Sequence, residues 1–189
     1  MSLIVLYKDT LIADQCCVLT APHAVGQTVL TKKIHVSADK TFAFASVGPT
    51  LTEDEKKLLE EIIRQTFRVA RGEKHSLELE HQDWFNERSQ LNFMVMTKQS
   101  NYFAHLIGGM YDRNETFRPR GASKQAHSLT RFDSSIPACY GTGAYAAFIA
   151  ASENVPMEQV VPLVSDVIYS VSREYSIFHR HQLKRMAFK

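Results

Sequence analysis

The sequence has only three cysteines, and their spacing excludes two kinds of support for a fold. Cys16 and Cys17 are adjacent and Cys139 lies far from both, so they form neither a disulfide framework nor a set of metal ligands. A chain of 189 residues can bury a sizeable core without such support. We therefore expect a protein that folds unaided in a reducing compartment and uses no cofactor.

Long hydrophobic runs are also missing. No stretch approaches the roughly 20 apolar residues that a helix needs to cross a bilayer. The N-terminal segment is apolar, but Lys8, Asp9 and Asp14 interrupt it, and it lacks the basic start and small-residue cleavage site of a signal peptide. These features predict a cytoplasmic protein with no membrane partner.

The chain has little excess charge of either sign. Its 22 basic and 20 acidic residues leave a net charge of +2, and they are spread evenly along the sequence. Nucleic-acid binding usually requires a face of many basic side chains that neutralise phosphates. The charge pattern therefore predicts no nucleic-acid partner, while 44% hydrophobic residues indicate a globular protein.

Several segments have the alternation and composition of β-strands. Residues 3–18 are rich in β-branched and aliphatic side chains and are broken only at Lys8-Asp9-Thr10, which predicts a hairpin. A second hairpin is expected from residues 91–97 and 102–107. Further strands are expected over residues 32–36, 42–47, 128–132 and 136–140, and the polar residues 111–127 are expected to form a surface loop.

One helix is predicted between two groups of these strands, and two more are predicted after the last strand. Thr52 and Glu55 fit a capping box, apolar residues then recur at helical spacing, and Gly72 ends the pattern. The small residues after Gly143 predict a second helix, and Val161, Val164, Ile168 and Val171 would share one face of a third. Strands and helices that segregate in this way indicate an α+β fold, with two antiparallel sheets and the helices outside.

Four landmarks in this order resemble a known family. They are the hairpin SLIVLYKDTLIAD, the lysine pair in TKKIH, the strand FAFASVG before a long helix, and GTGAYAAFIAA before the C-terminal helices. Together they are similar to the proteasome β-subunit/HslV branch of the N-terminal-nucleophile hydrolases. The resemblance implies a four-layer αββα sandwich that forms a single domain over residues 1–189.

In that family the first residue, exposed by processing, is the nucleophile, and its own α-amine accepts the proton. The resemblance therefore implies that removal of Met1 exposes Ser2 as the nucleophile, with serine in place of the usual threonine. The hairpin here is shorter than in the family, but both arms are shortened equally from the turn. The pairing is then preserved, and Ser2 is expected to lie across from Asp14.

The other site residues also come from the resemblance. Lys33 would lower the pKa of the amine, Asp14 would orient Lys33, and the backbone N–H of Gly48 would stabilise the oxyanion. Thr142 stands at the family's GSG serine, and Glu174 and Ser176 match the later aspartate and serine. The substrate would be a peptide or unfolded protein, and the partners would be copies of the same chain in a ring or stacked ring, with an unfoldase as a further partner.

Other interpretations of the same residues stay open. The chain could be a catalytically inactive subunit that keeps the fold for assembly or partner binding, or a hydrolase of small amides. Cys16 and Cys17 suggest a thiol nucleophile, although cysteine is more often a small buried hydrophobe. His179 and His181 suggest a metal site, but a solvated basic segment is the expected alternative, and Lys32 is expected to face solvent.

Overall fold

The computed structural model describes residues 3–18, 28–47, 51–73, 90–107, 109–111, 117–119 and 127–186. The chain divides into two compact units. The first comprises Met1–Thr50, Met94–Tyr102 and Arg131–Lys189, and the second comprises Leu51–Phe93 and Phe103–Thr130. The single domain expected over residues 1–189 stays a prediction.

The first sheet is built around the N-terminal hairpin. Its four antiparallel strands have the order β12-β1-β2-β13, with bounds β1 Leu3–Tyr7, β2 Thr10–Asp14, β12 Ala138–Gly141 and β13 Tyr175–His179. The predicted hairpin is confirmed, with Lys8 and Asp9 in its turn and Thr10 already in β2. Strand β12 begins later than predicted, after Pro137, which has no N–H to donate to a ladder.

The second sheet has the order β11-β8-β7-β6-β5. Its strands are β5 Ile34–Val36, β6 Phe42–Val47, β7 Gln90–Thr97, β8 Asn101–Ile107 and β11 His127–Phe132. Two short ribbons pair β3 (Cys16–Val18) with β4 (Thr28–Leu30) and β9 (Gly109–Tyr111) with β10 (Phe117–Pro119). The prediction of a loop over residues 111–127 is wrong for β9 and β10, because strands of three residues are too short for a visible alternation.

Helix α1 (Glu53–Ala70) begins and ends where the sequence predicts. The backbone N–H of Thr52 donates to the Glu55 carboxylate at 2.7 Å, and the N–H of Glu55 donates to Thr52 Oγ1 at 3.2 Å. This is a complete capping box, which satisfies two N–H groups that a helix start leaves unpaired. One face of α1 is buried, at Leu59, Ile62, Ile63 and Phe67.

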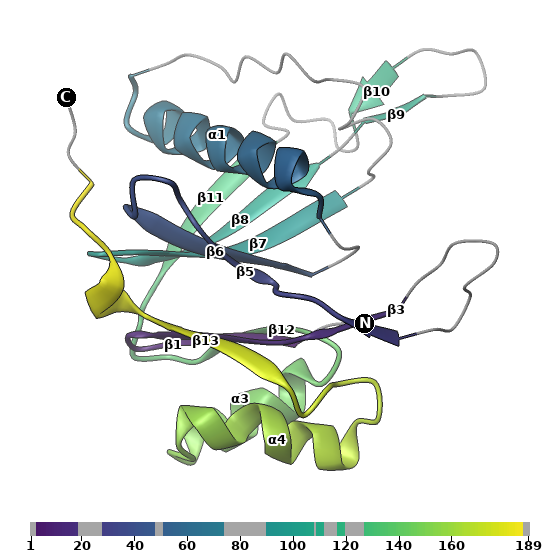
Figure 1. Cartoon of the computed structure of the whole chain (residues 1–189). Helices are drawn as coiled ribbons and strands as arrows, with labels where there is room; N and C mark the ends of the chain where they lie inside the picture. Colours follow the sequence, from purple (N-terminus) through teal and green to yellow (C-terminus); the bar gives the residue numbers. More distant parts are fainter. Residues whose placement is uncertain are drawn as a thin grey trace. The chain divides into compact units, whose positions relative to one another are not determined.

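Two further helices lie against the first sheet (Figure 1). They are α3 (Ala144–Ser152) and α4 (Met157–Val167), followed after β13 by the 3-10 turn η1 (Arg180–Gln182). Val161 and Val164 are buried in the same core as Leu3, Val5 and Ile12. Ile168 and Val171 were predicted on the helix but follow its end, and they still pack against this core.

The N-terminal hairpin is buried on both of its faces. Alternate residues of a strand point to opposite sides, so one set meets α3 and α4 while the other faces β5 and β6. Strand β1 contacts β6, and both β2 and β13 contact β5. This explains the nearly continuous apolar sequence of β1 and β2. Among the described residues, no helix is both long and apolar enough to span a bilayer.

The close packing of Gly143 gives a stability prediction. Gly143 has φ +83°, and a Cβ there would lie 2.7 Å from Val164 Cγ1. We expect Gly143→Ala to lower the free energy of unfolding by about 2–4 kcal/mol, because left-handed strain adds to overpacking. Urea denaturation measures the loss.

Gly72 provides the matched control. It has a similar φ of +73°, but a Cβ there would meet nothing within 4 Å. Gly72→Ala should therefore lower the free energy of unfolding only by the cost of the left-handed conformation, about 1 kcal/mol. Equal losses in the two variants would contradict the packing argument.

Candidate active site

A single carboxylate at the end of β2 accepts four hydrogen bonds. Asp14 is fully buried, and its Oδ1 accepts from the backbone N–H of Leu3 at 2.8 Å and from Lys33 Nζ at 2.7 Å. Its Oδ2 accepts from the backbone N–H groups of Cys16 and Ser172, each at 3.3 Å. A buried carboxylate is stable only when its oxygens are satisfied in this way.

Lys33 provides the positive charge for this carboxylate. It lies directly before β5, and its side chain is only 5% exposed, whereas the neighbouring Lys32 faces solvent as predicted. The ammonium and the Asp14 carboxylate form a buried ion pair at 2.7 Å. The predicted contact between the two residues is therefore present, while their part in catalysis stays a prediction.

The register of the hairpin determines what lies opposite Asp14. Ile4 pairs with Ala13 and Tyr7 with Thr10, so the next position in this register opposite Asp14 is that of Leu3, and not that of Ser2 as the sequence predicted. The Leu3 nitrogen that donates to Asp14 is bonded to the carbonyl carbon of Ser2. Asp14 therefore binds the peptide group that follows the candidate nucleophile. Ser2 itself and Gly48, the predicted oxyanion donor, lie outside the described residues.

Thr142 reaches the same end of the sheet from the other side of β1. Leu3 pairs with Gly141 of β12, and Thr142 follows directly in the turn before α3. It is half-buried. The turn is built on Gly141 and Gly143, which both have positive φ. The sequence thus correctly associated the glycine turn with the end of the sheet that carries Asp14.

The segment before β13 places its polar residues differently from the sequence prediction. The Ser176 hydroxyl accepts from Gln15 Nε2 at 3.0 Å, and Glu174 is exposed, with its carbonyl accepting from the N–H of Gln15 at 2.9 Å. Ser172 is the serine that contacts Asp14, and its Oγ accepts from the N–H of Glu174 at 3.0 Å. The contact of Ser172 with Asp14 is made by its backbone N–H, so the residue types in SVSREYS could not indicate it, and the predicted roles of Glu174 and Ser176 stay predictions.

The metal and thiol alternatives can be compared with the described part of the chain. Within it, no group of three or more His, Cys, Asp or Glu side chains could hold a metal ion. Cys16 is buried, and burial raises the pKa of the Cys139 thiol to about 12, so that thiol stays protonated near neutral pH. The rings of His179 and His181 stack on each other with centroids 5.6 Å apart, and His181 is exposed.

A double-mutant cycle tests the buried ion pair. Asp14→Asn and Lys33→Met should each lower the free energy of unfolding by about 3–5 kcal/mol, because each leaves a buried partner uncompensated. The double variant should lose clearly less than the sum of the two single losses. Chemical denaturation of the four proteins gives the coupling.

The exposed pair of Lys57 and Asp54, with its atoms 3.4 Å apart, is the control. Asp54→Asn and Lys57→Met should show a coupling close to zero, because water screens exposed charges. Strictly additive losses at Asp14 and Lys33 would show that the two side chains do not support each other.

Comparison of the fold with known proteins completes the description of the site. No protein family and no curated protein sequence matches this chain. Solved structures do match it. Eukaryotic HslV from Trypanosoma brucei aligns with a TM-score of 0.50 at 12% identity, covering 94% of this chain and 97% of HslV.

Two bacterial structures match over similar lengths. BPH from Thiobacillus denitrificans has a TM-score of 0.51 at 12% identity and covers 94% of this chain and 96% of its own. Anbu from Hyphomicrobium sp. strain MC1 has a TM-score of 0.50 at 11% identity and covers 96% and 84%. Among the described residues, the two larger antiparallel sheets and the three α-helices therefore have the proteasome/HslV fold, as the sequence predicted.

Proposed function

We propose that this chain is an N-terminal-nucleophile peptidase or amide hydrolase whose nucleophile is Ser2, exposed by removal of Met1. One observation carries the proposal: the Asp14 carboxylate binds both the Lys33 ammonium and the N–H of the peptide that joins Ser2 to Leu3. In the proposal, the same carboxylate of Asp14 therefore positions both the residue after the nucleophile and the buried cation.

The chemistry follows from a free amine at Ser2. The Ser2 hydroxyl attacks the scissile carbonyl, and the α-amine accepts its proton and then passes it to the leaving amine. The resulting ester is hydrolysed by water, which restores the hydroxyl. An α-amine has an unperturbed pKa of about 8, and a neighbouring ammonium lowers that pKa toward neutrality, which suits a general base.

The remaining residues take supporting roles in the proposal. Asp14 holds Lys33 in place and fixes the start of β1, and the N–H of Gly48 stabilises the oxyanion. Thr142 directly follows Gly141, the partner of Leu3, and this position in the register supports a role for it beside the amine. Glu174 and Ser176 keep the supporting roles that the resemblance implies, and the backbone N–H of Ser172 ties their segment to Asp14.

Active-site labelling tests the nucleophile. Mass spectrometry should find Met1 absent, and a hydroxyl-directed epoxyketone should add its mass to Ser2 of the wild-type chain. Ser2→Ala should not be labelled. Lys33→Ala should be labelled at least about a hundredfold more slowly, because without the Lys33 ammonium the α-amine is less suited to act as the general base, and general-base catalysis typically contributes that much.

Two outcomes would reject this assignment. Retention of Met1 would leave the amine on the wrong residue, and labelling that persists in Ser2→Ala would place the nucleophile elsewhere. A folded chain that is processed but never labelled would instead favour the inactive subunit that keeps the fold for assembly.

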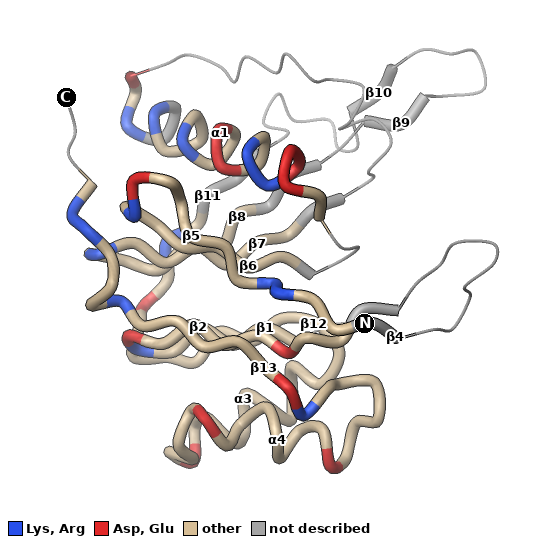
Figure 2. Tube along the Cα trace, viewed as in Figure 1, with Lys and Arg blue, Asp and Glu red and all other residues tan. Residues whose placement is uncertain are grey.

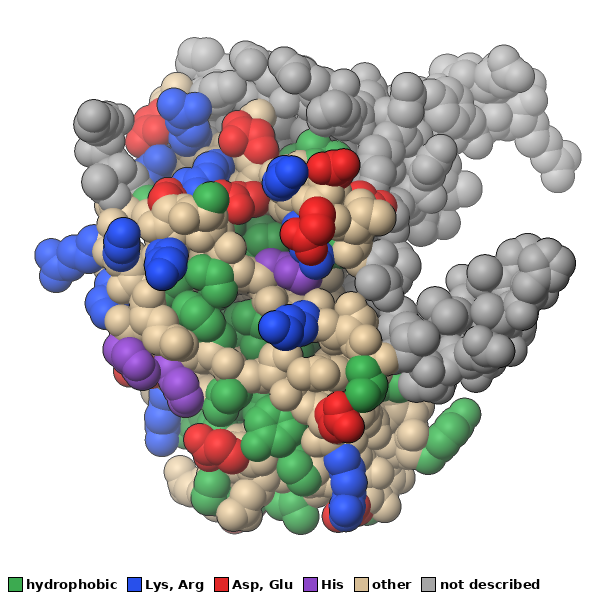
Figure 3. Space-filling view, viewed as in Figure 1, with side chains coloured by type: hydrophobic (Ala, Val, Ile, Leu, Met, Phe, Trp, Pro, Cys, Tyr) green, Lys and Arg blue, Asp and Glu red, His purple; other side chains and the backbone are tan. Residues whose placement is uncertain are grey.

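We also propose that the chain assembles into a homo-oligomer, and the surface of α3 and α4 supports this. Helix α3 contains no charged residue, and yet Tyr145, Phe148 and Ile149 are 79%, 40% and 47% exposed. On α4, Leu163 and Val167 are 47% and 71% exposed. Figure 2 shows no Lys or Arg along either helix, and Figure 3 shows hydrophobic side chains gathered over them. Contiguous apolar surface of this kind is typical of interfaces.

Disruption of this surface gives a direct test of assembly. Tyr145→Glu combined with Val167→Glu should shift the chain toward a monomer in light scattering, because each carboxylate would be desolvated in the contact. Ile136→Glu, which changes an apolar residue that is 57% exposed in the turn before β12, should leave the mass unchanged. A wild-type chain that is monomeric at all accessible concentrations would contradict the proposal.

A further inference from the structure

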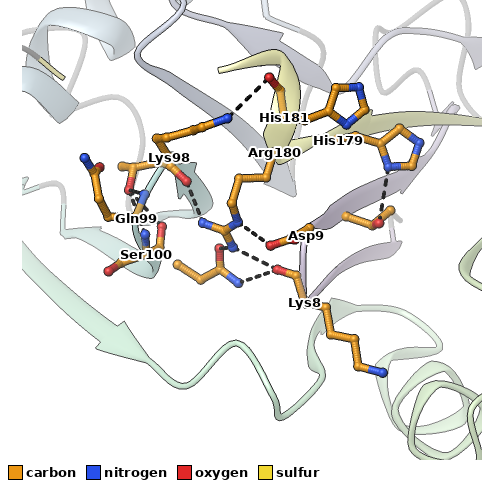
Figure 4. Close-up of polar contacts among 11 residues, drawn as sticks. Lys8, Asp9, Lys98, Gln99, Ser100, His179, Arg180 and His181 are labelled. Carbon is orange, nitrogen blue, oxygen red and sulfur yellow. Dashed lines mark hydrogen bonds and ion pairs between the residues drawn. The ribbon is translucent and has the colours of Figure 1, made fainter. Parts of the chain in front are cut away.

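The turn end of the N-terminal hairpin, opposite to the candidate site, is organised by a buried arginine. The Arg180 guanidinium donates to Asp9 Oδ1 at 2.6 Å, to the Lys8 carbonyl at 2.8 Å, to the Thr97 carbonyl at 2.5 Å and to Asn101 Oδ1 at 2.7 Å (Figure 4). These acceptors belong to the β1–β2 turn and to the two ends of the β7–β8 turn. The arrangement fixes three chain segments in one rigid framework.

Basic side chains surround this framework. The backbone N–H of Lys184 donates to the Lys40 carbonyl at 2.8 Å, and Lys98 Nζ donates to the His181 carbonyl at 3.4 Å, so the turns and the C-terminal segment are neighbours. We name this surface the basic end, and we define it by the exposed or half-buried cations Lys8, Lys40, Lys98, Arg131, Lys184 and Arg185. Figure 3 shows Lys and Arg side chains beside the His pair on this part of the molecule.

A cavity of about 390 Å³ opens at the same end. It adjoins the framework, because its lining residue Asn101 accepts from Arg180, and Ser134, also in the lining, accepts from the N–H of Lys8 through its carbonyl. The lining combines a guanidinium, a carboxylate, amides, hydroxyls and one phenyl ring, from Gln99, Ser100, Asn101, Arg131, Phe132, Asp133 and Ser134. Such a mixture can bind both a peptide backbone and an acidic side chain.

We propose that the basic end is a docking surface for an acidic peptide segment of a partner protein, with one acidic side chain held in the cavity near Arg131. Charge complementarity is the first reason, because six cations converge from segments far apart in the sequence, although the whole chain carries a net charge of only +2. The cavity is the second reason, because it provides a specific anchor inside the charged surface.

The carboxylates within the basic end favour a peptide over a nucleic acid. Asp9, Asp39 and Asp133 lie among the cations, and hydrogen bonds from Ser135 lower the pKa of Asp133, so that it stays charged. A nucleic-acid strand carries a phosphate at every nucleotide and would be repelled at each of these positions. An acidic peptide can place its carboxylates against the cations and donate its backbone N–H groups to Asp9, Asp39 and Asp133.

This inference is independent of the proposed catalysis. Strand β1 has five residues, so the basic end lies about 17 Å from the start of that strand at roughly 3.4 Å per residue. The docking surface would operate equally in an active hydrolase and in an inactive subunit. Failure of Ser2 labelling therefore leaves this inference untouched, and the reverse also holds.

Fluorescence anisotropy with a labelled oligoglutamate peptide tests the surface. The full chain should bind the peptide saturably, with an affinity that falls as salt rises, and should not bind the matched oligoglutamine peptide. Lys98→Glu combined with Lys184→Glu should weaken binding at least about tenfold. Arg131→Ala should weaken it at least about threefold, through loss of the cavity anchor.

The control variant makes the same change of charge on α1. Lys57→Glu combined with Arg68→Glu alters two exposed residues outside the basic end and should leave the affinity within about twofold. Thermal unfolding of each variant identifies loss of fold as a separate cause. The proposal is overturned if the folded wild type does not bind oligoglutamate, if both double variants weaken binding equally, or if an oligothymidylate of equal charge binds more tightly.

Discussion

The buried Asp14 carboxylate is the constraint on which the first unit depends. Its four donors come from the start of β1, the start of β3, the residue before β5 and the segment before β13. A charge removed from water requires this many partners, because each unsatisfied oxygen costs free energy. Segments that are distant in the sequence are therefore held at one point, and the peptide that follows Ser2 is one of them. The geometry of the candidate site therefore follows from the hydrogen bonds that satisfy the buried Asp14 carboxylate.

A second buried charge holds the other end of the same hairpin. Arg180 joins the β1–β2 turn to the β7–β8 turn and to the C-terminal segment, much as Asp14 joins the segments around the start of β1. A shift of register by one residue would turn the apolar side chains of β1 to the wrong faces and would break the contacts at both ends. The register of the hairpin is thus determined by the charged contacts at its two ends as well as by its apolar faces. This explains how the hairpin keeps one register despite its short arms.

The parts of the fold that were predictable are those in which local chemistry and packing agree. The nearly continuous apolar run of β1 and β2 indicates strands buried on both faces, and the capping box of Thr52 and Glu55 marks the start of α1. The contact of Ser172 with Asp14 could not be predicted, because it is made by a backbone N–H and depends on the path of the loop after α4. The basic end could not be predicted either, because its cations lie in separate turns and gather only when the sheets form. The net charge of the whole chain is close to zero and gives no indication of the basic end.

The Asp14–Lys33 pair shows why the fold and the activity are separate properties of this chain. Loss of either partner alone would leave an uncompensated charge in the core, so each residue contributes to stability whether or not the chain has a catalytic function. The presence of the pair is therefore not by itself evidence of catalysis. Ser2 differs in this respect, because none of the four donors that hold Asp14 is a Ser2 group and the hydroxyl could be lost without breaking that arrangement. Substitutions at Ser2 therefore report on catalysis, whereas substitutions at Asp14 and Lys33 report on catalysis and stability together.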